Sequence, residues 1–124
     1  MVVLRNKPNQ RGVKILQTTQ GSLQVNDYTQ HPVETTNDAI VIEENNDYKI
    51  VSYKLDSSFL INLLSKPVKN ARARAERAFV SNLNITQQQA CTLNVSVKTP
   101  FSVDPAYAGL ELGMSFCNNS VVLP

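Results

Sequence analysis

The pattern of hydrophobic and polar residues becomes regular from Asp47 onward. Residues 48–55 are rich in β-branched and aromatic side chains, residues 56–58 have turn composition, and residues 59–64 are apolar again. This spacing predicts a strand, a tight turn and a second strand, which together form a hairpin.

The strongest helical pattern covers residues 67–83, where apolar positions recur every three or four residues. These positions form one stripe: Val68, Ala71, Ala75, Ala78, Phe79 and Leu83. Because alanine is small, the helix is expected to lie close to a sheet, with Phe79 as its anchor. We expect Ser65 to cap the start of the helix and Pro67 to lie in its first turn.

A second, shorter helix is predicted after it. Thr86 is followed three residues later by Gln89, which is the capping-box pattern, and the helix should end near Cys91. Residues 92–99 and residues 110–117 then alternate between apolar and polar positions, which predicts two more strands.

Residues 1–46 are more polar, and only short strands are expected there, at residues 13–17, 23–25 and 39–42. We therefore predict a polar N-terminal segment of loops and short strands, residues 1–46, and a compact domain, residues 47–124. The predicted fold class is α+β: a mostly antiparallel sheet with one main helix packed on it, in the order β-β-α-β-β, after an irregular or β N-terminal segment.

Composition narrows the class of protein. The chain has 124 residues, of which 42% are hydrophobic, so it is the size of one domain and is not wholly disordered. It has no apolar run long enough to span a membrane. One His and two Cys are too few for a four-ligand Cys/His zinc site, and no nucleotide fingerprint is present, so we expect neither a metal nor a cofactor.

The net charge of +2 conceals strong segregation. Residues 1–14 carry four bases and no acid, residues 15–47 carry six acids and no base, and residues 66–77 carry five bases and one acid. Such segregation favours the acidic segment lying against the basic helix, or a partner doing so.

Within residues 66–77, a candidate anion-binding face consists of Lys66, Lys69, Arg74 and Arg77, with Arg72 at its flank. Such residues bind phosphates, but no aromatic residues are interleaved with them, so a solvated or acid-paired face is the favoured interpretation.

The two cysteines, Cys91 and Cys117, predict one disulfide in a small chain rich in Asn and Gln. Two reduced thiols remain the alternative. If residues 92–99 and 110–117 paired with the cysteines opposite each other, apolar positions would face small or polar ones. The disulfide therefore needs either a bulge at Gly113 or a Cys91 outside the ladder.

Catalysis is not expected. Cys91 and His31 are a candidate thiol–imidazole couple, but nothing in the sequence brings them together, and His31 lies in a polar loop. We therefore predict that the protein is not an enzyme.

Several short motifs occur together between Phe59 and Cys117. They are Ala75-Glu76, Ile85-Thr86 followed by Ala90-Cys91, Val95 and Val97 before Pro100, Tyr107-Ala108-Gly109, and Ser115-Phe116-Cys117. In this pattern the chain resembles the C-terminal soluble domain of small membrane-anchored or secreted proteins of unknown function from uncultured bacteria. The resemblance covers about half the chain. Leu83-Asn84 replaces the Leu-Gly of that pattern, and Asn tolerates the left-handed cap that Gly would adopt.

The resemblance implies an extracytoplasmic module and supports the disulfide, but it implies no reaction. The high amide content, 13 Asn and 8 Gln, favours the same compartment. No secretory signal follows Met1, so we expect any signal or anchor to lie outside this chain, a cytosolic protein being the alternative.

The predicted function is a non-enzymatic binding or assembly module for an unknown ligand, with a protein or a surface as partner. The first alternative is a subunit of a surface or virion assembly, an oligomer that uses its N-terminal arm. The second, less favoured, is a nucleic-acid or anionic-surface binder that uses the basic helix, residues 66–77.

Overall fold

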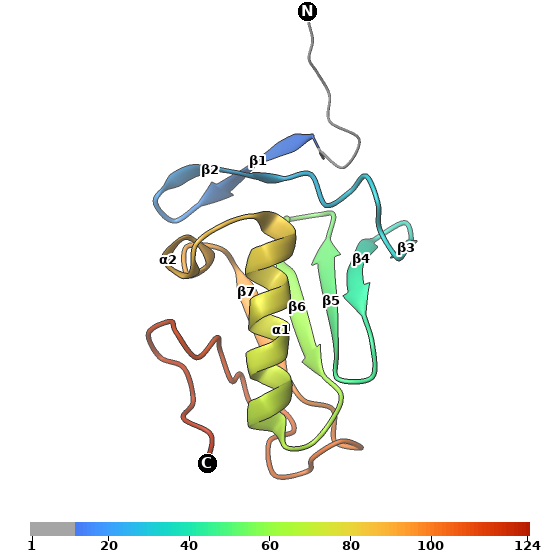
Figure 1. Ribbon diagram of the computed structural model, residues 1–124, viewed down its shortest axis with the longest axis vertical. Helices are drawn as coiled ribbons and strands as arrows, with labels where there is room; N and C mark the ends of the chain where they lie inside the picture. The colour runs from blue at the N-terminus through green and yellow to red at the C-terminus, as the bar shows by residue number, and fades with distance from the viewer. Residues whose placement is uncertain (1–11) are drawn as a thin grey trace, which may run out of the picture.

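The computed structural model describes residues 12–124 (Figure 1). The basic residues Arg5, Lys7 and Arg11 lie outside this range. In chain order the elements are β1 (Val13–Thr18), β2 (Gly21–Asn26), β3 (Glu34–Thr35), β4 (Ala39–Glu44), β5 (Tyr48–Tyr53), β6 (Phe59–Leu63), α1 (Val68–Leu83), α2 (Gln87–Ala90) and β7 (Val95–Lys98).

The main sheet has five strands in the order β3-β4-β5-β6-β7. All neighbours are antiparallel except β6 and β7, which run parallel, with Phe59 opposite Val95 and Ile61 opposite Val97. A parallel pair needs a crossover connection, and α1 supplies it while packing on one face of the sheet (Figure 1). The predicted α+β class is confirmed.

A separate two-stranded ribbon, β1 and β2, lies across the end of α1 (Figure 1). Gly21 begins β2 with a φ of +105°, which suits the tight turn between the two strands. Leu16 and Val25 on the ribbon are buried in the same core as the main sheet. The predicted division after residue 46 falls between β4 and β5, inside that sheet.

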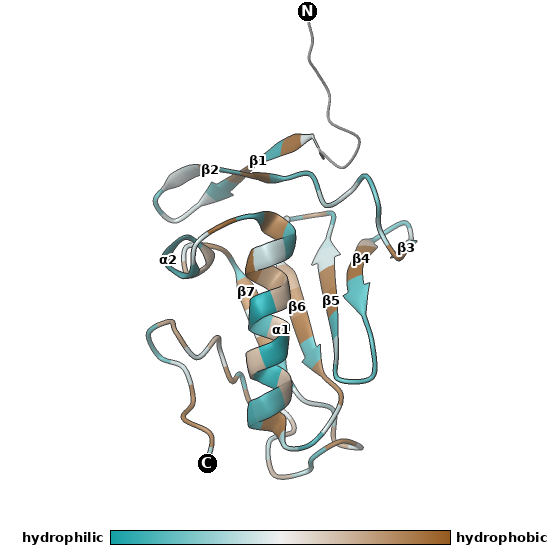
Figure 2. Cartoon of the chain, in the orientation of Figure 1, coloured by the Kyte–Doolittle hydropathy of each residue, from teal (hydrophilic) through white to brown (hydrophobic). Residues whose placement is uncertain are grey.

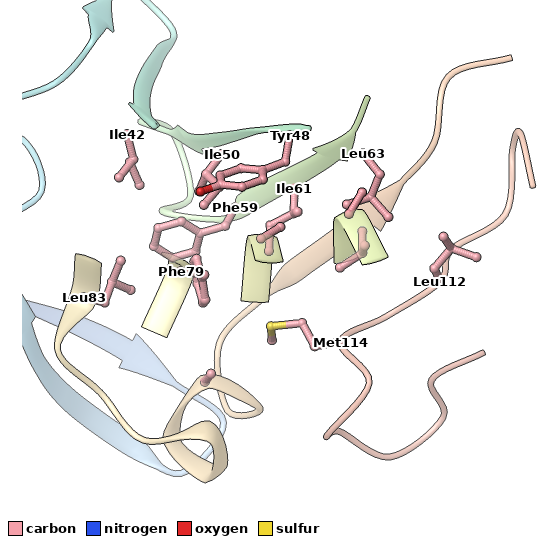
Figure 3. Close-up of a cluster of buried hydrophobic side chains, with 14 of the residues drawn as sticks. Ile42, Tyr48, Ile50, Phe59, Ile61, Leu63, Phe79, Leu83, Leu112 and Met114 are labelled. Carbon is pink, nitrogen blue, oxygen red and sulfur yellow. The ribbon is translucent and has the colours of Figure 1, made fainter. Parts of the chain in front are cut away.

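The stripe predicted on α1 is confirmed, because Ala78 is partly buried and the other five positions are fully buried: Val68, Ala71, Ala75, Phe79 and Leu83. Figure 2 shows hydrophilic residues along the face of α1 that is turned away from the sheet. Three aromatic rings meet edge to face in the core: Phe79 lies 5.1 Å from Phe59, and Phe59 lies 5.5 Å from Tyr28, between ring centroids. Figure 3 shows Phe59 and Phe79 side by side.

The start of α1 differs from the prediction. Ser65 does not cap the helix, because its hydroxyl donates to Asp47 Oδ1 at 2.8 Å. Pro67 is the N-cap instead, after a cis peptide bond, and its carbonyl accepts from the backbone N–H of Asn70 and Ala71. At the other end Asn84 adopts the left-handed cap, with a φ of 56°.

The strand predicted at residues 110–117 does not form. Residues 110–124, hereafter the C-terminal segment, have no helix or strand. The backbone N–H of Leu112 donates to the Val97 carbonyl at 2.9 Å, but the N–H of Val97 donates to the Glu111 side chain at 2.7 Å. The Glu111 side chain thus takes the place of a neighbouring strand at the edge of β7. Gly113 then turns the chain with a φ of +70°.

Within residues 12–124, no helix combines the length and the apolar character needed to cross a membrane.

Candidate functional site

Two adjoining hollows open at the end of β5. The first, which we call the inner cavity, has a volume of about 360 Å³ and lies between the ribbon, the loop after β2 and the main sheet. It is lined by two lysines, mostly hydroxyl-bearing side chains and one apolar residue: Lys14, Tyr28, Thr29, Thr35, Ile40, Ser52, Tyr53, Lys54 and Ser57.

The second hollow, which we call the outer groove, has a volume of about 590 Å³. Its lining adds carboxylates to the polar residues: Asn37, Asp38, Tyr53, Lys54, Leu55, Asp56 and Ser58. Tyr53 and Lys54 line both hollows, so the inner cavity and the outer groove are neighbours.

Tyr28 and Ser52 form the floor of the inner cavity, where both are buried. The Ser52 hydroxyl donates to the Tyr28 hydroxyl at 3.3 Å. Burial raises the pKa of Tyr28, so its phenol keeps its proton at neutral pH. Among the described residues the Ser52 hydroxyl is the only hydrogen-bond partner of the Tyr28 hydroxyl, which can therefore also bond to a ligand.

Two ammonium groups give the inner cavity its charge. Lys14 comes from β1, and Lys54 follows β5 with its Nζ donating to the Thr36 carbonyl at 2.6 Å. Within residues 12–124, neither ammonium lies within 4.0 Å of a carboxylate. The nearby carboxylate of Asp27 accepts instead from the backbone N–H of Thr29 at 3.0 Å and from its hydroxyl at 2.5 Å.

The outer groove differs from the inner cavity because two carboxylates line it. Asp56 accepts hydrogen bonds from the Ser58 hydroxyl at 2.7 Å and from its backbone N–H at 3.0 Å. These bonds lower the pKa of Asp56, so the carboxylate is ionised at neutral pH. Asp38 adds a second carboxylate, and the Tyr53 side chain is partly exposed between the two hollows.

The predicted disulfide is confirmed. Cys91 and Cys117 are bonded, with their Cα atoms 5.5 Å apart. Cys91 caps the end of α2 and Cys117 lies in the C-terminal segment, so both are outside the sheet. This arrangement removes the register conflict, and the capping box between Thr86 and Gln89 that positions Cys91 is also confirmed.

Arg72 is buried and does not belong to an anion-binding surface. Its Nη1 donates to the carbonyls of Val121, Leu112 and Gly113 at 2.9, 3.3 and 3.3 Å. Its Nε lies 3.9 Å from Glu76 Oε2. Arg72 therefore holds the C-terminal segment against α1.

Glu76, one turn further along α1, also holds the C-terminal segment, through its carboxylate. It accepts from the Ser115 backbone N–H at 2.5 Å and from the Ser115 hydroxyl at 2.7 Å. Both charges of the pair are thus satisfied by groups of the C-terminal segment.

The four residues of the predicted anion-binding face, Lys66, Lys69, Arg74 and Arg77, are exposed on or just before α1. Arg74 is paired, because its Nε donates to Asp47 Oδ2 at 2.9 Å. The last acid of the acidic segment therefore contacts the basic helix, and no hollow described above includes any of these four side chains.

The structure does not bring together the candidate catalytic couple. His31 is exposed, and both thiols are consumed by the disulfide. Within residues 12–124, no group of three His, Cys, Asp or Glu side chains is arranged to hold a metal ion.

No match to this chain was found in comparisons with protein families, with curated proteins or with solved structures. The site is therefore described from its own geometry. Sequence patterns missed it because Lys14, Tyr28 and Lys54 are far apart along the chain. The one local signal is the run of hydroxyl and amide side chains around Tyr28, which is equally typical of a polar loop.

Proposed function

We propose that this chain is a non-enzymatic binding module of an extracytoplasmic compartment, and that the inner cavity takes a small polar ligand. The observation that carries the proposal is the cavity itself. Its volume of about 360 Å³ lies within the usual range of ligand sites. It combines buried hydroxyls with two lysines that have no carboxylate partner among residues 12–124.

The disulfide supports the compartment. Cys91 and Cys117 are the only cysteines of the chain, and they are bonded to each other. Disulfides of this structural kind persist in oxidising compartments. Intact mass under non-reducing conditions tests this part of the proposal, since two free thiols in protein purified from its native source would contradict it.

Binding is tested by titrating isotope-labelled protein with a panel of small polar molecules and following backbone amide resonances by NMR. The panel contains neutral sugars, sugar acids and amino acids. We expect at least one of them to shift the resonances of Tyr28, Ser52 and Lys54 together. If no member of the panel shifts these resonances, the inner cavity is not a ligand site.

A second candidate function, assembly through the N-terminal part of the chain, is favoured by one observation. Val13 and Ile15 alternate on β1 and are 60% and 55% exposed. Replacing both with threonine keeps β-branched side chains on the strand and removes most of this apolar surface. If the ribbon is an assembly surface, light scattering will show an oligomer that this double variant dissociates.

A further inference from the structure

Resting on the proposed function, we propose a ligand class for the two hollows. The inner cavity binds a uronic-acid residue, a sugar ring that carries a carboxylate, and the outer groove binds a neutral sugar linked to it. The ligand is thus an oligosaccharide in which acidic and neutral sugars are neighbours.

Two lysines give the inner cavity a positive charge. Lys14 and Lys54 both line the inner cavity, and no carboxylate of residues 12–124 lies within 4.0 Å of either ammonium. Lys54 uses one of its three donors on the Thr36 carbonyl, which leaves two for a ligand. Charge-assisted hydrogen bonds from ammonium groups to a carboxylate are among the strongest available in proteins.

The inner cavity is also rich in hydroxyl groups. Tyr28, Ser52 and Ser57 each present a hydroxyl group, which can both donate and accept. The Thr29 hydroxyl donates to Asp27 and can still accept. A sugar ring presents hydroxyl groups all around its rim, whereas a simple carboxylic acid or inorganic phosphate has no such ring of hydroxyls. The buried Tyr28 hydroxyl is bonded only to Ser52 among the described residues, so it can also bond to a ligand. A cavity of about 360 Å³ also has room for a ring.

The outer groove and the inner cavity also differ in charge. Asp38 and Asp56 line the outer groove and do not line the inner cavity. Carboxylates accept hydrogen bonds from the hydroxyls of neutral sugars and repel a second acidic group. The partly exposed ring of Tyr53 lies at the junction, where the flat apolar face of a sugar can rest on it. The same two carboxylates disfavour a polyanion such as a nucleic acid.

The test uses three probes with the full chain: glucuronic acid, glucose, and the disaccharide of glucuronic acid and N-acetylglucosamine. Binding is measured by calorimetry, and its position by NMR shifts. We expect glucuronic acid to bind at least about tenfold more tightly than glucose, because the carboxylate gains charge-assisted bonds. The disaccharide should bind more tightly again, because it also fills the outer groove.

Variants separate the two hollows. Lys14→Met should weaken the binding of glucuronic acid about tenfold, whereas Lys69→Met removes an exposed lysine of α1 and should leave it unchanged. Asp38→Ala should remove much of the advantage of the disaccharide without changing the affinity for glucuronic acid. Thermal unfolding of each variant shows that a loss of binding is not a loss of folding.

Two outcomes overturn the inference in different ways. If glucose or an amino acid shifts the resonances of the inner cavity and glucuronic acid does not, the ligand class is wrong while the proposed binding function stands. If no probe of either panel shifts them, both are wrong. Equal binding of inorganic phosphate and glucuronic acid would show a general anion site, which also contradicts recognition of a sugar.

Discussion

Two regions of the molecule use charged and polar side chains in opposite ways: the region beside β7 and the end of β5. Beside β7, Arg72 and Glu76 of α1 are buried, and their hydrogen bonds all go to the C-terminal segment. Near the end of β5, Lys14 has no carboxylate partner within the described range, and the buried Tyr28 hydroxyl is bonded there only to the Ser52 hydroxyl. Charged groups with charged partners fix an irregular segment, whereas charged groups without a carboxylate partner in a cavity are typical of a ligand site.

The largest expected effect on stability comes from removing the contacts of Arg72 that hold the C-terminal segment beside β7. Arg72→Met should lower the free energy of unfolding by about 3–5 kcal/mol, because it leaves Glu76 as an unpaired buried charge and three carbonyls without their donor. Urea denaturation measures this loss. The matched control is Arg74→Met on the same helix. Its ion pair with Asp47 is exposed, and its loss should cost about 1 kcal/mol or less. Equal losses in the two variants would contradict the contrast between buried and exposed pairs.

The disulfide reinforces the same region and should have the next largest effect. It joins residues separated by 26 positions. Restricting a loop of that length in the unfolded chain stabilises the protein by about 3.5 kcal/mol in the chain-entropy model. We expect the double variant Cys91→Ser and Cys117→Ser to lose about this amount in urea denaturation, and reduction of the wild-type protein to match it. A loss below about 1 kcal/mol would mean that the non-covalent contacts alone hold the segment.

A substitution at the end of β5 should lower the free energy of unfolding much less. Tyr28→Phe keeps the ring that packs on Phe59 and removes one hydrogen bond of 3.3 Å. Thermal or urea unfolding should show a loss of about 1 kcal/mol or less. A larger loss than that of the disulfide variant would show that the Tyr28 hydroxyl is structural, and would weaken the contrast between the two regions.

The smallest effect is a dependence on pH at the exposed contact between Asp47 and α1. Hydrogen bonds from Ser65 and Arg74 lower the pKa of Asp47 below its usual 3.8 in the folded protein. The contribution of Asp47 is therefore complete above that value and is lost as the pH falls through the lowered pKa. The difference in urea midpoint between the wild-type protein and Asp47→Asn should shrink from pH 6 to pH 3. A difference that grows on acidification would contradict this sign.

Local patterns predicted the parts of the fold that depend on local interactions. The apolar stripe that contains Phe79 is a property of α1 itself, and the capping box of Thr86 and Gln89 is closed within one turn. The disulfide was also predicted, although its geometry was resolved only by the position of Cys91 outside the sheet.

The prediction failed where partners come from a distant part of the chain. In the C-terminal segment, Leu112 and Met114 are buried as in an alternating strand, but Leu110 is 46% exposed. The backbone bonds that a strand would give to a neighbour go to Arg72 and Glu76 instead. Alternation alone does not distinguish these two arrangements. The inner cavity was missed for a related reason, because Lys14 and Lys54 meet only after the ribbon docks on the sheet.

The single parallel pair in the main sheet sets an order for folding during synthesis. β4, β5 and β6 pair through short connections and can form as soon as they leave the ribosome. β7 reaches β6 only after both helices have been made. Until α1 has been made, the apolar side chains of β6, including Phe59 and Ile61, lack its cover, and until β7 pairs, one edge of β6 stays open. Unpaired edges of this kind are where nascent chains aggregate, so the protein is most vulnerable between the synthesis of β6 and that of β7.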